Sequence, residues 1–90
     1  MTLQQRLDRA ARRGKLSTAD LAVWFALPYQ TVRSYRQRGS VPRRARRLRV
    51  QLRLQRLERA IHDQRFPVPV NVRSRRSYLL KIGQQMRRQR

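Results

Sequence analysis

Residues 16–39 read LSTADLAVWFALPYQTVRSYRQRG, and this stretch decides the fold of the chain. Ser17 and Asp20 have the spacing of a capping box, in which side-chain oxygens satisfy backbone N–H groups at a helix start. Pro28 disfavours helical geometry at the residue before it, and it can itself open the next helix. The stretch therefore predicts two short helices joined by a tight turn, the second over residues 28–38.

Apolar residues give each of these two helices an inward face. Leu21 and Phe25 lie one helical turn apart in the first helix, and Val32 and Tyr35 have the same relation in the second. Trp24 is expected in the core, because a buried aromatic residue is commoner at such a position than a platform for stacking bases.

The residues before this stretch predict one more helix. Thr2 and Gln5 have capping-box spacing, and Gly14 is placed to end the helix. We therefore expect residues 1–40 to form a three-helix unit.

The segment 41–65 predicts one long helix from Pro42 to about Gln64, because Arg, Leu, Gln and Ala are good helix formers. It carries two apolar stripes on nearly opposite faces. The first stripe is Val41, Ala45, Leu48 and Leu52, and the second is Val50, Leu54, Leu57 and Ile61. The first is expected to pack on the three-helix unit, and the second on the tail of the same chain or on another subunit.

The segment 66–90 begins with FPVPVNV over residues 66–72, which cannot be helical with two prolines so placed. Its alternating valines predict an extended arm lying on an apolar surface. A final basic helix should begin at Ser74 or Ser77, with an interruption at Gly83 and an apolar side made of Tyr78, Leu79, Ile82 and Met86. The predicted fold class is all-α.

The amino-acid composition limits the classes of function that the chain could have. The 90 residues contain 24 Lys and Arg against 4 Asp and Glu, a formal net charge of +20. Nearly all the basic residues are Arg, whose planar fork binds phosphate in a bidentate way, so a nucleic acid is the expected partner. With no Cys, 1 His and few carboxylates, we expect no catalytic site, metal, cofactor or small-molecule substrate.

The apolar runs are short. The longest, Leu21 to Leu27, has 7 residues, whereas about 20 are needed to cross a bilayer. Polar residues precede it, so no signal-peptide core is expected. We therefore expect no membrane partner and a cytoplasmic protein, located in the host cell or the virion if a phage encodes it.

Residues 16–39 resemble the helix-turn-helix family of DNA-binding proteins, of the type found in phages and mobile elements. Two positions depart from the family pattern: Ala26 stands where Gly is usual in the turn, and Pro28 stands where a Ser or Thr cap is usual. The matching residues are Leu21, Ala22 and Phe25 in the first helix, Ala26 and Leu27 in the turn, and Val32 and Tyr35 in the second helix. The resemblance implies that residues 1–40 form a DNA-binding unit in which the second helix of the motif enters the major groove of double-stranded DNA.

The outward side of helix 28–38 has side chains suited to base edges, since Gln can pair with adenine and Arg with guanine. The candidate base-reading residues are Tyr29, Gln30, Arg33, Ser34 and Gln37. Cations nearby would hold phosphates without reading sequence. The candidate phosphate-binding residues are Arg12, Arg13, Lys15, Arg36, Arg38, Arg43 and Arg44.

Site-specific DNA binding, as in transcription regulation, is the first functional prediction. A phage packaging protein similar to a small terminase subunit, or a virion DNA-binding protein, is the alternative, and RNA binding is the third. A homo-oligomer, either a dimer or larger, is expected through Leu54, Leu57 and Ile61.

Overall fold

Five α-helices make up most of residues 1–88, the part of the chain that this computed structural model describes, with side chains as far as Arg87. No strand occurs in residues 1–88, so the all-α prediction is confirmed. The helices are α1 (Leu3–Gly14), α2 (Thr18–Phe25), α3 (Tyr29–Gln37), α4 (Arg44–His62) and α5 (Arg75–Arg88).

Both predicted capping boxes are present. At the start of α2 the backbone N–H of Asp20 donates to Ser17 Oγ at 3.1 Å, and the N–H of Ser17 donates to Asp20 Oδ2 at 2.9 Å. Thr2 and Gln5 make the same pair of bonds at the start of α1. α1 ends at Gly14, as predicted, and Lys15 after it takes the left-handed conformation, with φ 52°.

The turn between α2 and α3 keeps a left-handed residue although it lacks glycine. Ala26 has φ 54°, and the N–H of Leu27 donates to the carbonyl of Ala22 at 3.1 Å. Pro28 then precedes α3 without a side-chain cap. After α3, Gly39 has φ 68°, which favours glycine at this position. The spacing of α2 and α3 therefore follows the prediction.

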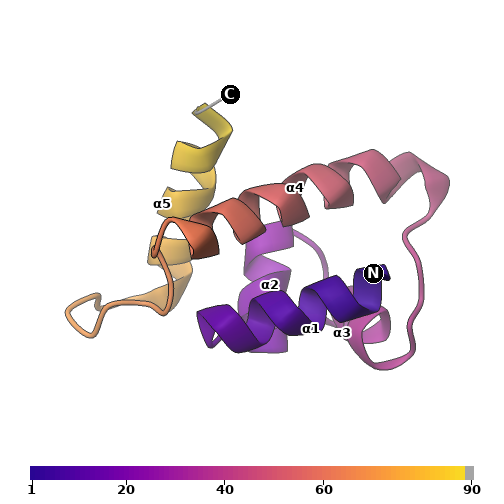
Figure 1. The fold of residues 1–90 in the computed structure, drawn as a ribbon, viewed down its shortest axis with the longest axis horizontal. Coiled ribbons are helices and arrows are strands. Elements are labelled where there is room, and N and C mark those ends of the chain that lie inside the picture. The colour runs from indigo at the N-terminus through magenta and orange to yellow at the C-terminus, as the bar shows by residue number, and fades with distance from the viewer. Residues whose placement is uncertain (89–90) are drawn as a thin grey trace.

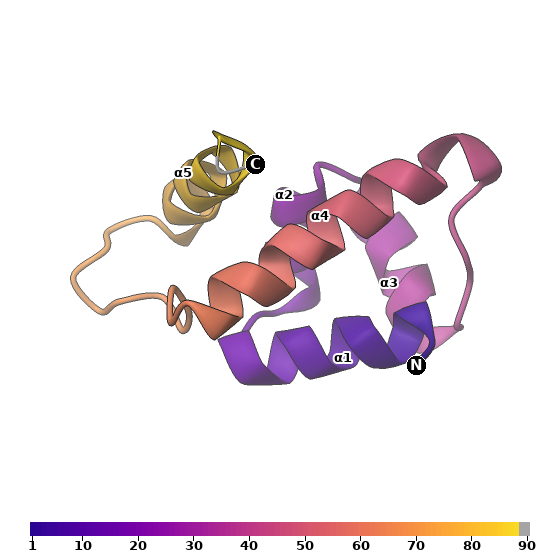
Figure 2. The ribbon, with the colours of Figure 1, turned by 45° about the horizontal axis from the view of Figure 1, so that its top comes forward.

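One core joins all five helices. α2 packs against α3, α4 and α5, while α1 packs against α3 and α4. Figures 1 and 2 show α1 and α4 lying side by side and running in the same direction. α3 lies at one end of the molecule, and the connection from α4 to α5 loops out at the other end (Figure 2). α3 and α5 are therefore far apart.

α4 buries the second of its two predicted apolar stripes. The first stripe, expected to pack on the three-helix unit, is exposed to solvent. Leu48 is 68% exposed, and Val41, Ala45 and Leu52 are also exposed, so the packing prediction for the first stripe is wrong. The buried residues of α4 are Val50, Leu54, Leu57 and Ala60. They pack among α1, α2 and α5, whose positions determine which face of α4 is covered.

The predicted oligomer interface is corrected by this packing. Leu54 and Leu57 are each 0% exposed within a single chain, and Ile61 is half-buried against the same core. These leucines therefore have no surface to offer another subunit. Of the two occupants foreseen for this stripe, the tail of the same chain covers it, together with α1 and α2.

Phe66 anchors the extended arm. Its ring meets Trp24 edge-on at a centroid distance of 5.8 Å and Tyr78 at 6.1 Å. Val68 also packs against the core, but Val70 is fully exposed, so the arm lies on the apolar surface only in part. α5 runs without a break through Gly83, against prediction. Gly83 faces the indole of Trp24, and a Cβ at this position would make an ordinary van der Waals contact with that ring at 3.9 Å.

Asp20 also ties α2 to α5. Arg75 Nη2 donates to Asp20 Oδ2 at 2.8 Å and to the carbonyl of Lys15 at 3.1 Å. Burial raises the pKa of Asp20, but hydrogen bonds from Arg75 and Ser17 outweigh burial and leave that pKa below its usual value. The carboxylate thus contributes stability that is present above its unfolded pKa of about 3.9 and is lost as the pH falls through the lower folded pKa.

Asp20→Asn should therefore lower the free energy of unfolding by about 1 kcal/mol at pH 7, because the ion pair and a negative charge at the start of α2 are both lost. At pH 2.5 the difference should be smaller than at pH 7, because the contribution of the carboxylate is lost as the pH falls below its unfolded pKa. Urea unfolding followed by circular dichroism at both pH values tests this. An equal difference at both pH values would contradict the role given to the charge.

Candidate nucleic-acid interface

A groove of about 580 Å³ lies between the outer side of α3 and the segment that leads into α4. α3 contributes Gln30, Thr31, Arg33, Ser34 and Gln37, with Tyr35 beneath them. The following segment contributes Arg38, Val41, Arg43 and Arg46. We call this feature the α3 groove. Four arginines line it and no carboxylate does.

Most of the predicted base-reading residues come together in the α3 groove. Arg33 Nε donates to Gln37 Oε1 at 3.1 Å, so the two exposed side chains are held beside each other one turn apart. Gln30 lines the groove one turn before Arg33, while Tyr29 is half-exposed at the start of α3 and does not line it. These amide and guanidinium groups can form bidentate hydrogen bonds to base edges.

The structure corrects the prediction that Ser34 reads a base. Ser34 lines the groove but is half-buried, and its hydroxyl shares a 2.7 Å hydrogen bond with the hydroxyl of Ser40. The backbone N–H of Ser40 also donates to the carbonyl of Ser34. Ser34 therefore closes the end of α3 instead of reaching a base, because its hydroxyl is committed to the loop.

Arg36 is a second correction, because its guanidinium is engaged within the protein. Its Nε donates to Asp8 Oδ1 at 3.1 Å and its Nη1 donates to Thr18 Oγ1 at 2.9 Å. Its carbonyl accepts a 2.7 Å hydrogen bond from Gln4 Nε2. Arg36 thus links α3 to α1 and α2. The prediction that Arg36 binds phosphate is wrong for this structure, because its guanidinium already has partners within the protein.

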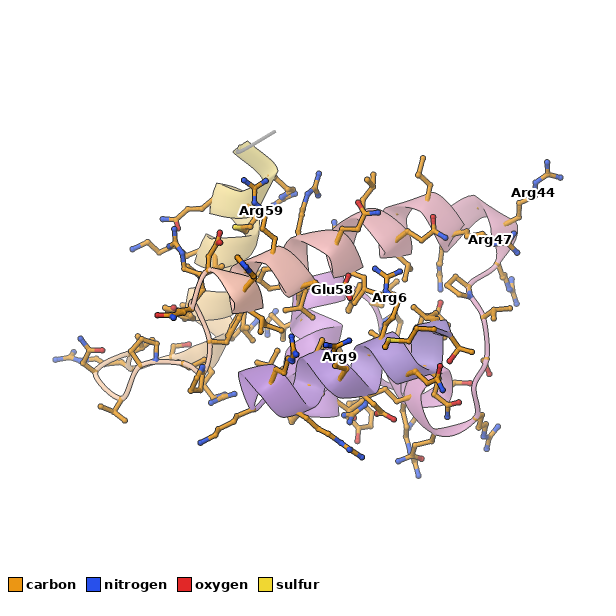
Figure 3. The ribbon with its side chains drawn as sticks, in the orientation of Figure 1. Arg6, Arg9, Arg44, Arg47, Glu58 and Arg59 are labelled. Carbon is orange, nitrogen blue, oxygen red and sulfur yellow. The ribbon has the colours of Figure 1, made fainter. Side chains whose placement is uncertain are left out.

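The other predicted phosphate ligands divide into two groups. Arg38 and Arg43 line the α3 groove, and Arg44 points away from the body at the beginning of α4 (Figure 3). Arg12 and Arg13 line a different groove on α1, and with Lys15 they belong to the end of α1 that lies away from α3 (Figure 2). The structure does not bring that second group together with the reading face.

Sequence reasoning missed three residues of the α3 groove: Thr31, Val41 and Arg46. Arg46 follows Arg43 by three residues, a helical spacing that could have placed both on one side of α4. Thr31 and Val41 carried no comparable signal, because Val41 was read as part of a packing stripe.

The acidic side chains lie away from the α3 groove, so no carboxylate neutralises the positive charge of its four arginines. Asp8 pairs with Arg36 at 3.1 Å, and Asp20 with Arg75 at 2.8 Å. Glu58 of α4 and Arg6 of α1 point toward each other in Figure 3 and form a two-bond ion pair, which raises the pKa of Arg6. Asp63, the fourth, lies 3.4 Å from His62. Each of the four Asp and Glu side chains thus lies against a residue outside the α3 groove.

Within residues 1–88 no group of His, Asp or Glu is arranged to hold a metal ion. No helix in that range combines the length and the apolar character needed to cross a membrane. Comparison of the chain with protein-family models, with curated proteins and with solved structures finds no match.

Proposed function

We propose that this protein binds double-stranded DNA, with α3 in the major groove and arginines of the α3 groove on the phosphates. The observation that carries the proposal is the α3 groove itself: four arginines and two glutamines face it, and no carboxylate lines it. Such a surface attracts a polyanion, and its Gln and Arg side chains can read base edges.

The arrangement of α2 and α3 supports a helix-turn-helix assignment for this unit. An eight-residue helix, a turn with Ala26 in the left-handed conformation and a nine-residue helix follow one another, and the two helices pack together. Val32 and Tyr35 are buried, which leaves Gln30, Arg33 and Gln37 on the outer side of α3. In a helix-turn-helix protein this outer side meets the bases.

Site-specific binding is favoured over a packaging role. A packaging protein would use its long helix and its arm to join subunits, but Leu54 and Leu57 of α4 and Phe66 of the arm are buried in the chain itself. The exposed apolar residues in and just before α4, which are Val41, Leu48 and Leu52, lie among arginines that would repel a second copy. A homo-oligomer therefore stays a prediction that sedimentation can test.

The first experiment measures binding of the full chain to a labelled 25-base-pair duplex between 50 and 200 mM salt. If six to ten phosphates are contacted, log Kobs should fall with log salt at a slope of about −5 to −9, a loss of roughly 10³ to 10⁵ in affinity over this range. An RNA duplex of the same length serves as competitor, and it should compete more weakly. A flat salt response, or tighter binding of the RNA, would contradict the proposal.

A further inference from the structure

A second groove, of about 200 Å³, lies where α2, α4 and α5 meet. Arg53 and Arg56 of α4 and Arg87 of α5 line it beside Trp24. Arg49 is one turn before Arg53 on the same helix and repels it, as Arg56 and Arg87 do. We call Arg49, Arg53, Arg56 and Arg87 the α4–α5 arginine cluster. It joins residues that are far apart in the sequence.

We propose that the α4–α5 arginine cluster is a second phosphate-binding site, along which the DNA backbone continues after leaving the α3 groove. This inference rests on the proposed function and extends its interface to the other end of α4. The occupant is the sugar–phosphate backbone of a duplex, because the cluster offers guanidinium groups and lacks the set of amide and hydroxyl groups that would read bases.

The spacing of arginines along α4 supports a continuous track. Arg46 lines the α3 groove, and Arg49, Arg53 and Arg56 follow at intervals of three, four and three residues, which keeps all four on one side of the helix. From Arg46 to Arg56 the helix rises about 15 Å. That distance corresponds to roughly four phosphates of one strand, at about 3.4 Å of axis each.

Arg53 is the member of the cluster that lies beside Trp24 and is repelled by the other three arginines. Its Nη1 donates to the carbonyl of Trp24 at 3.3 Å, while Trp24 Nε1 donates to the carbonyl of Arg53 at 2.9 Å. Burial, followed by repulsion from Arg49, Arg87 and Arg56, lowers the pKa of Arg53. The Asp and Glu side chains lie against Arg6, Arg36, His62 and Arg75, so none of them forms an ion pair with the cluster.

A purely structural explanation accounts for Arg53 but not for the others. Arg53 satisfies a carbonyl at the end of α2, where cations are favoured. Arg56 and Arg87 make no hydrogen bond and no ion pair within residues 1–87, and both repel Arg53. Groups that cost stability yet are gathered in one groove are what a functional anion site requires.

The test compares two double variants of the full chain that lose the same charge. Arg56→Gln with Arg87→Gln changes the cluster, whereas Arg73→Gln with Arg76→Gln changes exposed arginines near the start of α5. Binding to the 25-base-pair duplex is measured across the same salt range. The cluster variant should bind roughly 30-fold more weakly near 150 mM salt, with a slope less steep by about 1.8, and the control should match the wild type.

Thermal unfolding separates a binding role from a structural one. Removing repulsive charge should leave the melting temperature of the cluster variant equal to or above that of the wild type. A lower melting temperature would assign the cluster to stability and overturn the inference. If the wild type binds the duplex and the two variants show equal salt slopes, the inference is wrong but the proposed function stands. If the wild type does not bind duplex DNA at all, the proposed function itself is refuted.

Discussion

Leu57→Ala should lower the free energy of unfolding by about 2–5 kcal/mol, because a fully buried side chain is replaced by a cavity. Leu57 is in the part of α4 that packs among α1, α2 and α5. Domains of this size are stable by only about 5–15 kcal/mol, so the loss is a large share of the total. Chemical denaturation followed by circular dichroism measures it.

Leu48→Ala is the matched control, since it makes the same chemical change on the same helix. Leu48 is 68% exposed, so its replacement should change the free energy of unfolding by no more than about 0.5 kcal/mol. If Leu48→Ala were the more damaging of the two, the face of α4 that packs on the core would be the opposite one.

Arg33→Ala should reduce discrimination between a preferred duplex and a scrambled duplex by about 1–3 kcal/mol, because Arg33 would lose a bidentate contact to a base. Its side chain is exposed and bonds only to Gln37, so the fold should remain intact. Selection from a random duplex pool supplies the preferred sequence. Competition titrations with both duplexes then measure the difference, and Gln30→Ala should act in the same direction.

Arg12→Ala is the control for this experiment. Arg12 lies on the part of α1 that does not reach the α3 groove, so its loss should leave the ratio of the two affinities unchanged. If Arg33→Ala instead weakened both duplexes equally, α3 would hold phosphates and would not read bases.

Local signals predicted most of the fold. The two capping boxes, Pro28 and the prolines of the arm each act within a few residues of themselves, and the helices begin and end near the expected positions. The face of α4 could not be predicted in this way. Its two stripes have similar apolar content, and the choice between them depends on where α2 and α5 lie, which is long-range information.

In the candidate site, too, local signals placed some residues and long-range contacts decided the others. Gln30, Arg33 and Gln37 could be placed from helical periodicity, because they follow from Val32 and Tyr35 facing inward. Arg36 could not, because a sequence with many arginines and few carboxylates does not show which arginine each carboxylate holds. The α4–α5 arginine cluster could not be predicted for a similar reason, because Arg87 comes near Arg53 only when α5 folds back onto α4.

The exposed beginning of α4 has a consequence for the thermodynamics of binding. No side chain of residues 43–49 is buried, and Figure 3 shows Arg44 and Arg47 extending from this end. Helical order there is maintained by intrinsic propensity against the mutual repulsion of neighbouring guanidinium groups, so this end should open at a lower free energy than the core. An anion that neutralises these groups removes the repulsion, so helical order at this end and occupancy of the α3 groove favour each other.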